Sequence, residues 1–133
     1  MGQPAAKKGD QIVALDTHIV MVPTPPGPPV PTPLPHPFAG IIDDGLSADV
    51  NIMGQPAATV DSTAGNSPQH IPTPPGLSFQ SPPANKATIK FGSATVKING
   101  KMAARNGDMA STCNDPSELP VGKVIAVGTV LIG

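Results

Sequence analysis

Aromatic residues are almost absent from this chain, whose 133 residues include three Phe and no Tyr or Trp. Only 38% of the residues are hydrophobic, so small aliphatic side chains must form the core, and that core must be thin. By length the chain is expected to form one domain, residues 1–133. Because a thin core contributes little free energy of folding, such a domain needs a further stabilising element.

Cysteine and charge are also scarce. The single Cys excludes an intramolecular disulfide, which leaves a metal ion, oligomerisation or docking on a partner as the stabilising element. Charged residues make up 13%, whereas a disordered chain usually stays soluble through its charge. The 19 Pro and 14 Gly therefore favour a compact fold of loops and hairpins over a disordered tail.

The charge balance excludes further classes of function. A net charge of -1 and a pI near 6.2 provide no basic surface for nucleic acid. No long apolar run follows the first residues, MGQPAAKK, so we expect neither a secretion signal peptide nor a membrane anchor. Export of such a protein would require another machine to carry it.

Three segments of the chain resemble one another: GQPAAKKGD at 2–10, GQPAATVD at 54–61 and GKMAARNGD at 100–108. The last two share a lead-in, VNIMG at 50–54 and VKING at 96–100. A second similarity follows the first two copies, where HIVMVPTPPG at 18–27 resembles HIPTPPG at 70–76. Internal repetition therefore organises the chain.

The strand signals predict an all-β fold. Residues 88–91 and 94–98, joined by Gly92 and Ser93, predict a β-meander that continues through a turn at Asn99 and Gly100. Residues 123–127 and 129–132, split by Gly128, predict a hairpin, and residues 11–15 predict another strand. No segment has a helical period, apart from one short turn around Leu46.

Residues 23–37 contain nine prolines, which cannot donate hydrogen bonds to a strand ladder. We therefore predict a loop or a polyproline segment in this region. One interpretation is a flexible linker or a ligand for a domain with an aromatic groove. The other is a brace for metal ligation, because His36 ends the segment within PLPHPF and flanking prolines pre-order its side chain.

The candidate metal ligands are His18, His36, His70 and Cys113, which are all the histidines and the only cysteine. His18 and His70 each lie sixteen residues after the glycine of their copy (18 − 2 and 70 − 54), and Cys113 lies thirteen after Gly100. Three imidazoles and a thiolate complete a tetrahedral zinc set with no position for water, which is typical of a structural site. Iron is the alternative metal; calcium and magnesium prefer oxygen ligands.

Catalysis is the competing class of function. Cys113 with a histidine base could act as a nucleophile, but no helix start precedes it to lower its pKa, and a thin core leaves little room for a substrate. Asp10, Asp61 and Asp108 recur in the three copies, and we expect them to accept backbone N–H groups in turns. The sequence therefore predicts a protein that is not an enzyme.

With the copies PAAK at 4–7, PAAT at 56–59 and MAAR at 102–105, and with three His and one Cys, the chain resembles the PAAR-repeat family over nearly its whole length. The literal PAAR is absent, and the middle copy lacks the Gly before Asp61. The resemblance implies a small cone of short β-hairpins with pseudo-threefold repeats and zinc near its apex. It also implies a partner, the blunt β-helical end of a trimeric VgrG-like spike.

The resemblance further implies a mechanical function, in which the tip sharpens a contractile injection spike and contacts a target membrane transiently. Effector proteins are further expected partners, although the chain ends at Gly133, directly after the last expected strand, so we expect no fused effector. The protein would reside in the bacterial cytoplasm before assembly and leave with the spike. The alternative is a free-standing zinc-stabilised adaptor that recruits partners through its Pro-rich loops. The type of contractile machine is left open.

Overall fold

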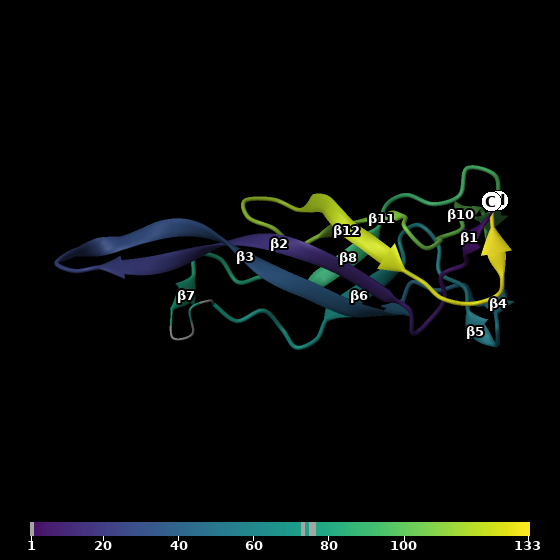
Figure 1. Cartoon of the computed structure of the whole chain (residues 1–133), viewed down its shortest axis with the longest axis horizontal. Coiled ribbons are helices and arrows are strands. Elements are labelled where there is room, and N and C mark those ends of the chain that lie inside the picture. Colours follow the sequence, from purple (N-terminus) through teal and green to yellow (C-terminus); the bar gives the residue numbers. More distant parts are fainter. Residues whose placement is uncertain (1, 73, 75–76) are drawn as a thin grey trace.

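The computed structural model describes residues 2–72, 74 and 77–133, and within them every regular element is a β-strand. The all-β prediction is therefore confirmed. Figure 1 shows an elongated molecule in which the β2–β3 hairpin projects at one end, while the short strands and the C-terminus lie at the other. No helix in the described part of the chain is long and apolar enough to cross a membrane.

In chain order, the strands are β1 Gln3–Pro4, β2 Gln11–Thr24, β3 Gly27–Asp44, β4 Asn51–Ile52, β5 Gln55–Pro56, β6 Thr63–Asn66, β7 Ser78–Phe79, β8 Lys86–Ile89, β9 Lys97–Ile98, β10 Lys101–Met102, β11 Met109–Thr112, β12 Leu119–Ile125 and β13 Leu131–Ile132.

Six of these strands form a closed ring. Their hydrogen-bonded order is β12-β11-β8-β6-β3-β2, and β12 also pairs with β2, so the sheet returns to its first strand. Every pairing is antiparallel. The seventh strand, β7, pairs with β2 at Val20 and Met21, outside the ring. Side chains that alternate toward the inside of this ring form the core.

The core is thin, as the composition predicts. Among the described residues, half of the twenty buried hydrophobic side chains are alanine. Phe38, Ile12, Ile42 and Ile89 are the largest fully buried apolar side chains. With so few large side chains, the core buries little apolar area, and the free energy of folding from this source is correspondingly small.

The three sequence copies meet in a cycle of backbone hydrogen bonds. Ala6 donates its N–H to the carbonyl oxygen of Ala104 at 2.9 Å, Ala104 donates to Ala58 at 3.1 Å, and Ala58 donates back to Ala6 at 3.0 Å. All three side chains are fully buried. Because the three backbones approach so closely, only a small side chain fits at these positions. We call these three residues the alanine ring.

Beyond the alanine ring, the first residues of each copy lie in a two-stranded antiparallel pair. In β4–β5 and β9–β10 both turn residues have positive φ, 51° and 81° at Met53 and Gly54, and 52° and 80° at Asn99 and Gly100. This is the pattern of a type I′ turn, so the turn predicted at Asn99 and Gly100 is confirmed. The corresponding pair for the first copy is β1 with β13, from opposite ends of the chain.

The predicted equivalence of Asp61 with Asp10 and Asp108 is wrong. Asp10 and Asp108 accept the backbone N–H three residues before them, as expected, at 3.0 and 2.7 Å. In the middle copy the hydroxyl of Ser62 accepts the corresponding bond, at 2.9 Å. Asp61 has a φ of 81° and so replaces the glycine that stands before Asp10 and Asp108. In the middle copy, Ser62 is therefore the equivalent of Asp10 and Asp108, one residue after Asp61.

The prediction of a loop or polyproline segment at residues 23–37 is also wrong, because most of it lies in β3, paired with β2. Pro33 and Pro35 lie opposite Ile19 and Thr17, whose N–H groups point away from β3 to side chains that follow β11, at 2.9 and 2.7 Å. The backbone hydrogen bonds between β2 and β3 are therefore made by the residues that lie between these positions. Prolines at every second position need no donor toward β2, so the strand tolerates them.

Other local predictions fail because distant strands compete for pairing. β8 pairs with β6 and β11 rather than with β9, and β12 pairs with β11 and β2 rather than with β13. Residues 45–50, around Leu46, are irregular and not helical. Part of the second similarity, at 73 and 75–76, lies outside the described residues.

Candidate metal centre

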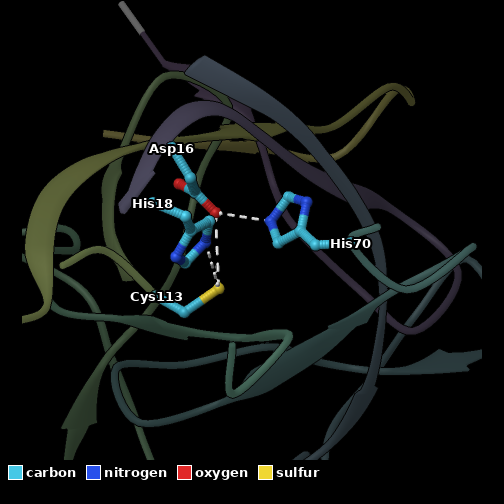
Figure 2. A group of neighbouring side chains, drawn as sticks. All are labelled: Asp16, His18, His70 and Cys113. Carbon is cyan, nitrogen blue, oxygen red and sulfur yellow. Dashed lines mark hydrogen bonds and ion pairs between the residues drawn. The ribbon is translucent and has the colours of Figure 1, made fainter. Parts of the chain in front are cut away.

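The structure brings three of the four predicted ligands, His18, His70 and Cys113, into one donor group inside the ring of strands, and it places His36 beside that group. His18 lies on β2, His36 on β3, Cys113 directly after β11 and His70 in the segment between β6 and β7. Donor atoms of His18, His70, Cys113 and one further residue, Asp16, all lie within 4.8 Å of one another (Figure 2). The ring of His36 lies 5.6 Å from that of His18 and 5.8 Å from that of His70, centroid to centroid.

Asp16 is the member of this group that the sequence patterns did not single out. It is fully buried on β2, directly opposite His36 on β3, so the two side chains share the inner face of the hairpin. A signal was present in the sequence, because Asp16 and His18 are two residues apart and, on one continuous strand, must point the same way. The predicted strand ended at residue 15, which concealed that relationship.

The spacing of the donors suits a metal ion. Asp16 Oδ2 lies 3.1 Å from His70 Nε2 and 3.4 Å from Cys113 Sγ, and Cys113 Sγ lies 3.7 Å from His18 Nε2. Tetrahedral zinc, with metal–ligand distances of about 2.0–2.3 Å, places its ligand atoms roughly 3.3–3.8 Å apart. These donors can therefore surround one ion with little rearrangement.

His36 is oriented as a ligand. Its Nδ1 lies 3.0 Å from the carbonyl oxygen of Leu34, which can only accept, so Nδ1 carries the proton and donates. The lone pair is then on Nε2, which is buried and has no hydrogen-bond partner among the described residues. An imidazole whose other nitrogen is held by a carbonyl is typical of metal-ligating histidines.

His18 is oriented by a carboxylate. Its Nδ1 lies 3.5 Å from Asp115 Oδ2, close enough for an ion pair but without the alignment of a hydrogen bond. Asp115 Oδ2 itself accepts the backbone N–H of Ile19 at 2.9 Å. With Nδ1 turned toward this carboxylate, Nε2 faces Cys113. Such a carboxylate on the far nitrogen fixes the ring and makes the ligand more basic.

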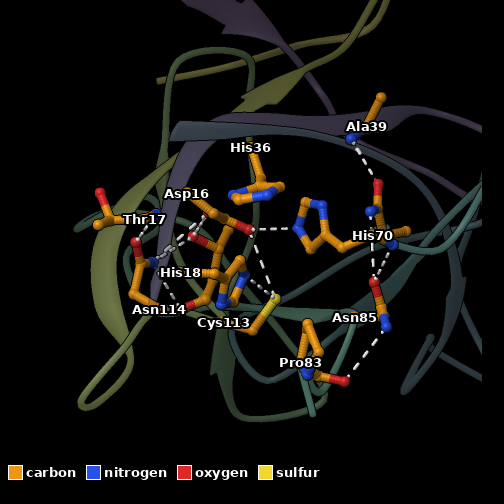
Figure 3. A network of polar contacts seen from close by, with 12 residues as sticks. Asp16, Thr17, His18, His36, Ala39, His70, Pro83, Asn85, Cys113 and Asn114 are labelled. Atoms are coloured by element: carbon orange, nitrogen blue, oxygen red, sulfur yellow. Dashed lines mark hydrogen bonds and ion pairs between the residues drawn. The ribbon is translucent and has the colours of Figure 1, made fainter. Parts of the chain in front are cut away.

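A network of amide side chains positions His70. The backbone N–H of His70 donates to Asn85 Oδ1 at 2.7 Å, and Asn85 donates to the carbonyl of Pro83 at 3.2 Å (Figure 3). Asn66 also donates to Asn85 Oδ1, at 3.4 Å, and its own Oδ1 accepts the N–H of Ala39 on β3. Although His70 lies outside any strand, its backbone is thereby tied to the ring of strands.

Burial shifts the pKa values of two of these groups. Burial, and secondarily the neighbouring His70, lower the pKa of His18 below 6.5, against the opposing effect of Asp115 and Asp16. Burial, and secondarily the Asp16 carboxylate, raise the pKa of Cys113 to about 11. In the metal-free protein the imidazole is therefore neutral and the thiol protonated at pH 7, and a protonated thiol is a poor nucleophile.

Two phenylalanines enclose the histidines. Phe79, on β7, packs against His36 and His18 at centroid distances of 5.2 and 5.7 Å, and Phe38 lies 6.1 Å from His70. His36 and His70 also line a surface recess of about 340 Å³ together with residues 66–69. The recess therefore lies directly beside two of the candidate ligands.

The residues fit a metal ion by three independent features: mutually adjacent donor atoms, an unpartnered buried nitrogen on His36, and second contacts that orient His18 and His36. Nitrogen and sulfur donors favour zinc or iron over calcium and magnesium.

Comparisons of the chain with protein-family models, with curated proteins and with solved structures find no match.

Proposed function

We propose that this chain is a PAAR-type tip, a zinc-stabilised cone that caps a trimeric VgrG-like spike and sharpens it for membrane penetration. The observation that carries the proposal is the alanine ring, in which Ala6, Ala58 and Ala104 are bonded in a cycle. Because the three related segments are arranged in a cycle, their strands can present three similar backbone edges at one end of the molecule. A threefold partner can contact all three at once.

The proposed docking surface is the end of the molecule formed by three short strand pairs, the hairpins β4–β5 and β9–β10 and the pair β1–β13 (Figure 1). Exposed apolar side chains occur on these strand pairs and on the segment that leads to β13, at Met53, Val127, Val130 and Leu131. Burial of such side chains against a partner is favourable by about 25 cal/mol per Å². The remaining backbone edges can pair with strands of the partner.

The proposed piercing end is the β2–β3 hairpin, which narrows to a turn between Thr24 and Gly27. His18 lies six residues before Thr24, so at about 3.3 Å per residue the turn extends roughly 20 Å beyond the metal centre. The centre therefore lies below the apex, where the hairpin joins the ring of strands. It ties β2 and β3 to the segments that carry His70 and Cys113.

His18, His36, His70 and Cys113 would hold the ion. A structural zinc ion contributes roughly 10–16 kcal/mol of apparent folding free energy in small domains, which is comparable with the total stability of an ordinary domain. Bonds from the ion to side chains on four separate segments would resist shear between the β2–β3 hairpin and the rest of the ring of strands. A piercing tip needs that resistance, and the alanine-rich core alone provides little of it.

The test is assembly with a purified VgrG-type trimer from the same organism, measured by native mass spectrometry. We expect one chain per trimer. Leu131→Glu, at the proposed docking end, should weaken the complex at least tenfold. Val30→Glu, on the projecting hairpin, is the matched control because it places the same charge at an exposed apolar position far from that end, and it should leave the affinity unchanged.

Absence of a complex, or three chains per trimer, would contradict the proposal. Capture of a polyproline-binding domain without spike binding would favour the adaptor instead. The pairing of β3 with β2 weighs against an adaptor, because a polyproline II ligand must present an unpaired backbone to its groove.

A further inference from the structure

Asp16 is a buried carboxylate that the proposed three-histidine, one-cysteine centre does not use. We propose that Asp16 Oδ2 is itself a ligand of this centre, so that a divalent ion, the thiolate and the carboxylate together carry no net charge. The inference rests on the proposed metal centre and specifies its composition and charge.

Charge balance favours a carboxylate ligand. A divalent ion with one thiolate and three neutral imidazoles leaves a net charge of +1 in a site whose ligands are buried. A buried charge is costly unless it is paired. Within the described residues, His70 is the only basic side chain at ion-pair distance from Asp16. A carboxylate at this position balances the remaining charge of the thiolate-bound ion.

The geometry of the donors favours the same assignment. Asp16 Oδ2 contacts two of the other donor atoms, His70 Nε2 at 3.1 Å and Cys113 Sγ at 3.4 Å. In the metal-free protein it accepts hydrogen bonds from both groups. Metal binding removes the thiol proton, and a neutral imidazole that binds through Nε2 carries its proton on Nδ1 instead. Asp16 therefore holds the ligands close together before the ion arrives.

The second oxygen of the carboxylate is held in place by neighbouring side chains. This atom, Oδ1, accepts the hydroxyl of Thr112 and lies 3.5 Å from Asn114 Nδ2. Asn114 Nδ2 also donates to the backbone carbonyl of Thr112, and Asn114 Oδ1 accepts the N–H of Thr17 at 2.7 Å (Figure 3). With Oδ1 occupied by these donors, Oδ2 is directed at His70 and Cys113. Hydrogen-bonded carboxylates of this kind are typical of metal ligands.

The experiment compares the full wild-type chain with Asp16→Asn, using Zn²⁺ affinity by chelator competition and the visible absorption bands of the Co²⁺-loaded protein. Asparagine keeps the shape and removes the charge. We expect at least a tenfold loss of Zn²⁺ affinity and a change in the position and intensity of the Co²⁺ bands. The matched control is Asp43→Asn, which removes an exposed carboxylate of β3 outside the donor group and should keep the wild-type Zn²⁺ affinity and Co²⁺ bands.

Each other outcome overturns a defined part of the proposal. Unchanged affinity and bands in Asp16→Asn would overturn the inference, and lower affinity with unchanged bands would overturn direct coordination. A wild-type chain that binds neither ion would instead contradict the metal centre itself. If Asp16→Asn does not fold, as judged by circular dichroism, a crystal structure of the zinc-loaded wild-type protein decides. An Asp16 oxygen at about 2.0–2.2 Å from zinc supports the inference, and one beyond about 3 Å overturns it.

Discussion

His36 donates its Nδ1–H to the carbonyl oxygen of Leu34, two residues earlier on the same strand, at 3.0 Å. Backbone and side chain thus fix the tautomer that leaves Nε2 free to bind a metal. The bond is local, so it should form whenever β3 forms. The orientation of the His36 ring is therefore set by its own strand, independently of the segments that carry His70 and Cys113.

We expect His36→Ala to lower Zn²⁺ affinity by at least tenfold, because it removes the one buried ring nitrogen that Leu34 holds ready for a ligand. Chelator competition measures the change. Phe79→Leu is the control, since Phe79 packs on the same imidazole but has no donor atom. It should lower thermal stability while binding one equivalent of zinc. Equal affinity in wild type and His36→Ala would show that His36 is not a ligand.

Removal of the metal should lower the melting temperature of the wild-type protein by more than about 10 °C. Loss of several kcal/mol has this effect, because each kcal/mol shifts the midpoint of a domain this size by roughly 3–5 °C. Calorimetry with and without a chelator, together with elemental analysis, provides the measurement. Cys113→Ser and His70→Ala should melt at lower temperature and show no further response to the chelator. A wild-type protein without metal, or variants of full stability, would refute a stabilising ion.

The metal-free protein should be most stable between about pH 6.5 and pH 9. The raised pKa of Cys113, from 9.0 to about 11, favours the protonated thiol in the fold, so stability is complete below pH 9 and falls by roughly 2 kcal/mol by pH 11. The lowered pKa of His18 favours the neutral ring, so stability is present above pH 6.5 and falls as the pH decreases.

Urea unfolding at a series of pH values measures this profile. Cys113→Ser in chelator is the control for the alkaline limb, because serine does not titrate in this range. If the decline above pH 9 is the same in Cys113→Ser, the thiol is not its cause.

The prolines of β3 should prevent the projecting hairpins of two molecules from pairing with each other. Pro31 and Pro33 lie at alternate positions, at which neighbouring β2 residues point their N–H groups away from β3, so the outer edge of β3 offers few donors. We expect a Pro31→Val and Pro33→Val double variant to self-associate at high concentration, as measured by light scattering. Thr32→Val adds a similar apolar side chain without a new edge donor and should remain monomeric. A monomeric double variant would contradict this role.

The alanine ring should tolerate no larger side chain. Ala104 is fully buried where three backbones meet, so Ala104→Leu must displace at least one of them and should destabilise the fold by roughly 1–3 kcal/mol or more. Ala94→Leu, at an exposed position, should change stability by less than about 0.5 kcal/mol. Chemical denaturation measures both. Equal stabilities would show that the ring is not closely packed.

Local sequence determined several features correctly. The Asn99–Gly100 turn follows from the positive φ that both residues adopt readily, and the all-β fold follows from the absence of helical periodicity together with frequent turn residues. The candidate ligands were listed from composition, because the chain has no other histidine or cysteine, and the structure places donor atoms of His18, His70 and Cys113 within 4.8 Å of one another.

Tertiary structure decided the rest, because strand pairing is non-local. The sequence did not indicate that β8 pairs with β6 and β11, or that β12 closes the ring onto β2. Nor did it indicate that the proline-rich segment forms a strand, since this depends on which neighbour each N–H faces. Asp16 could be associated with the ligands only once β2 was known to continue through His18 and to place Asp16 opposite His36. Composition thus named the donor atoms, whereas the register of the long hairpin determined which of them, and which carboxylate, share one site.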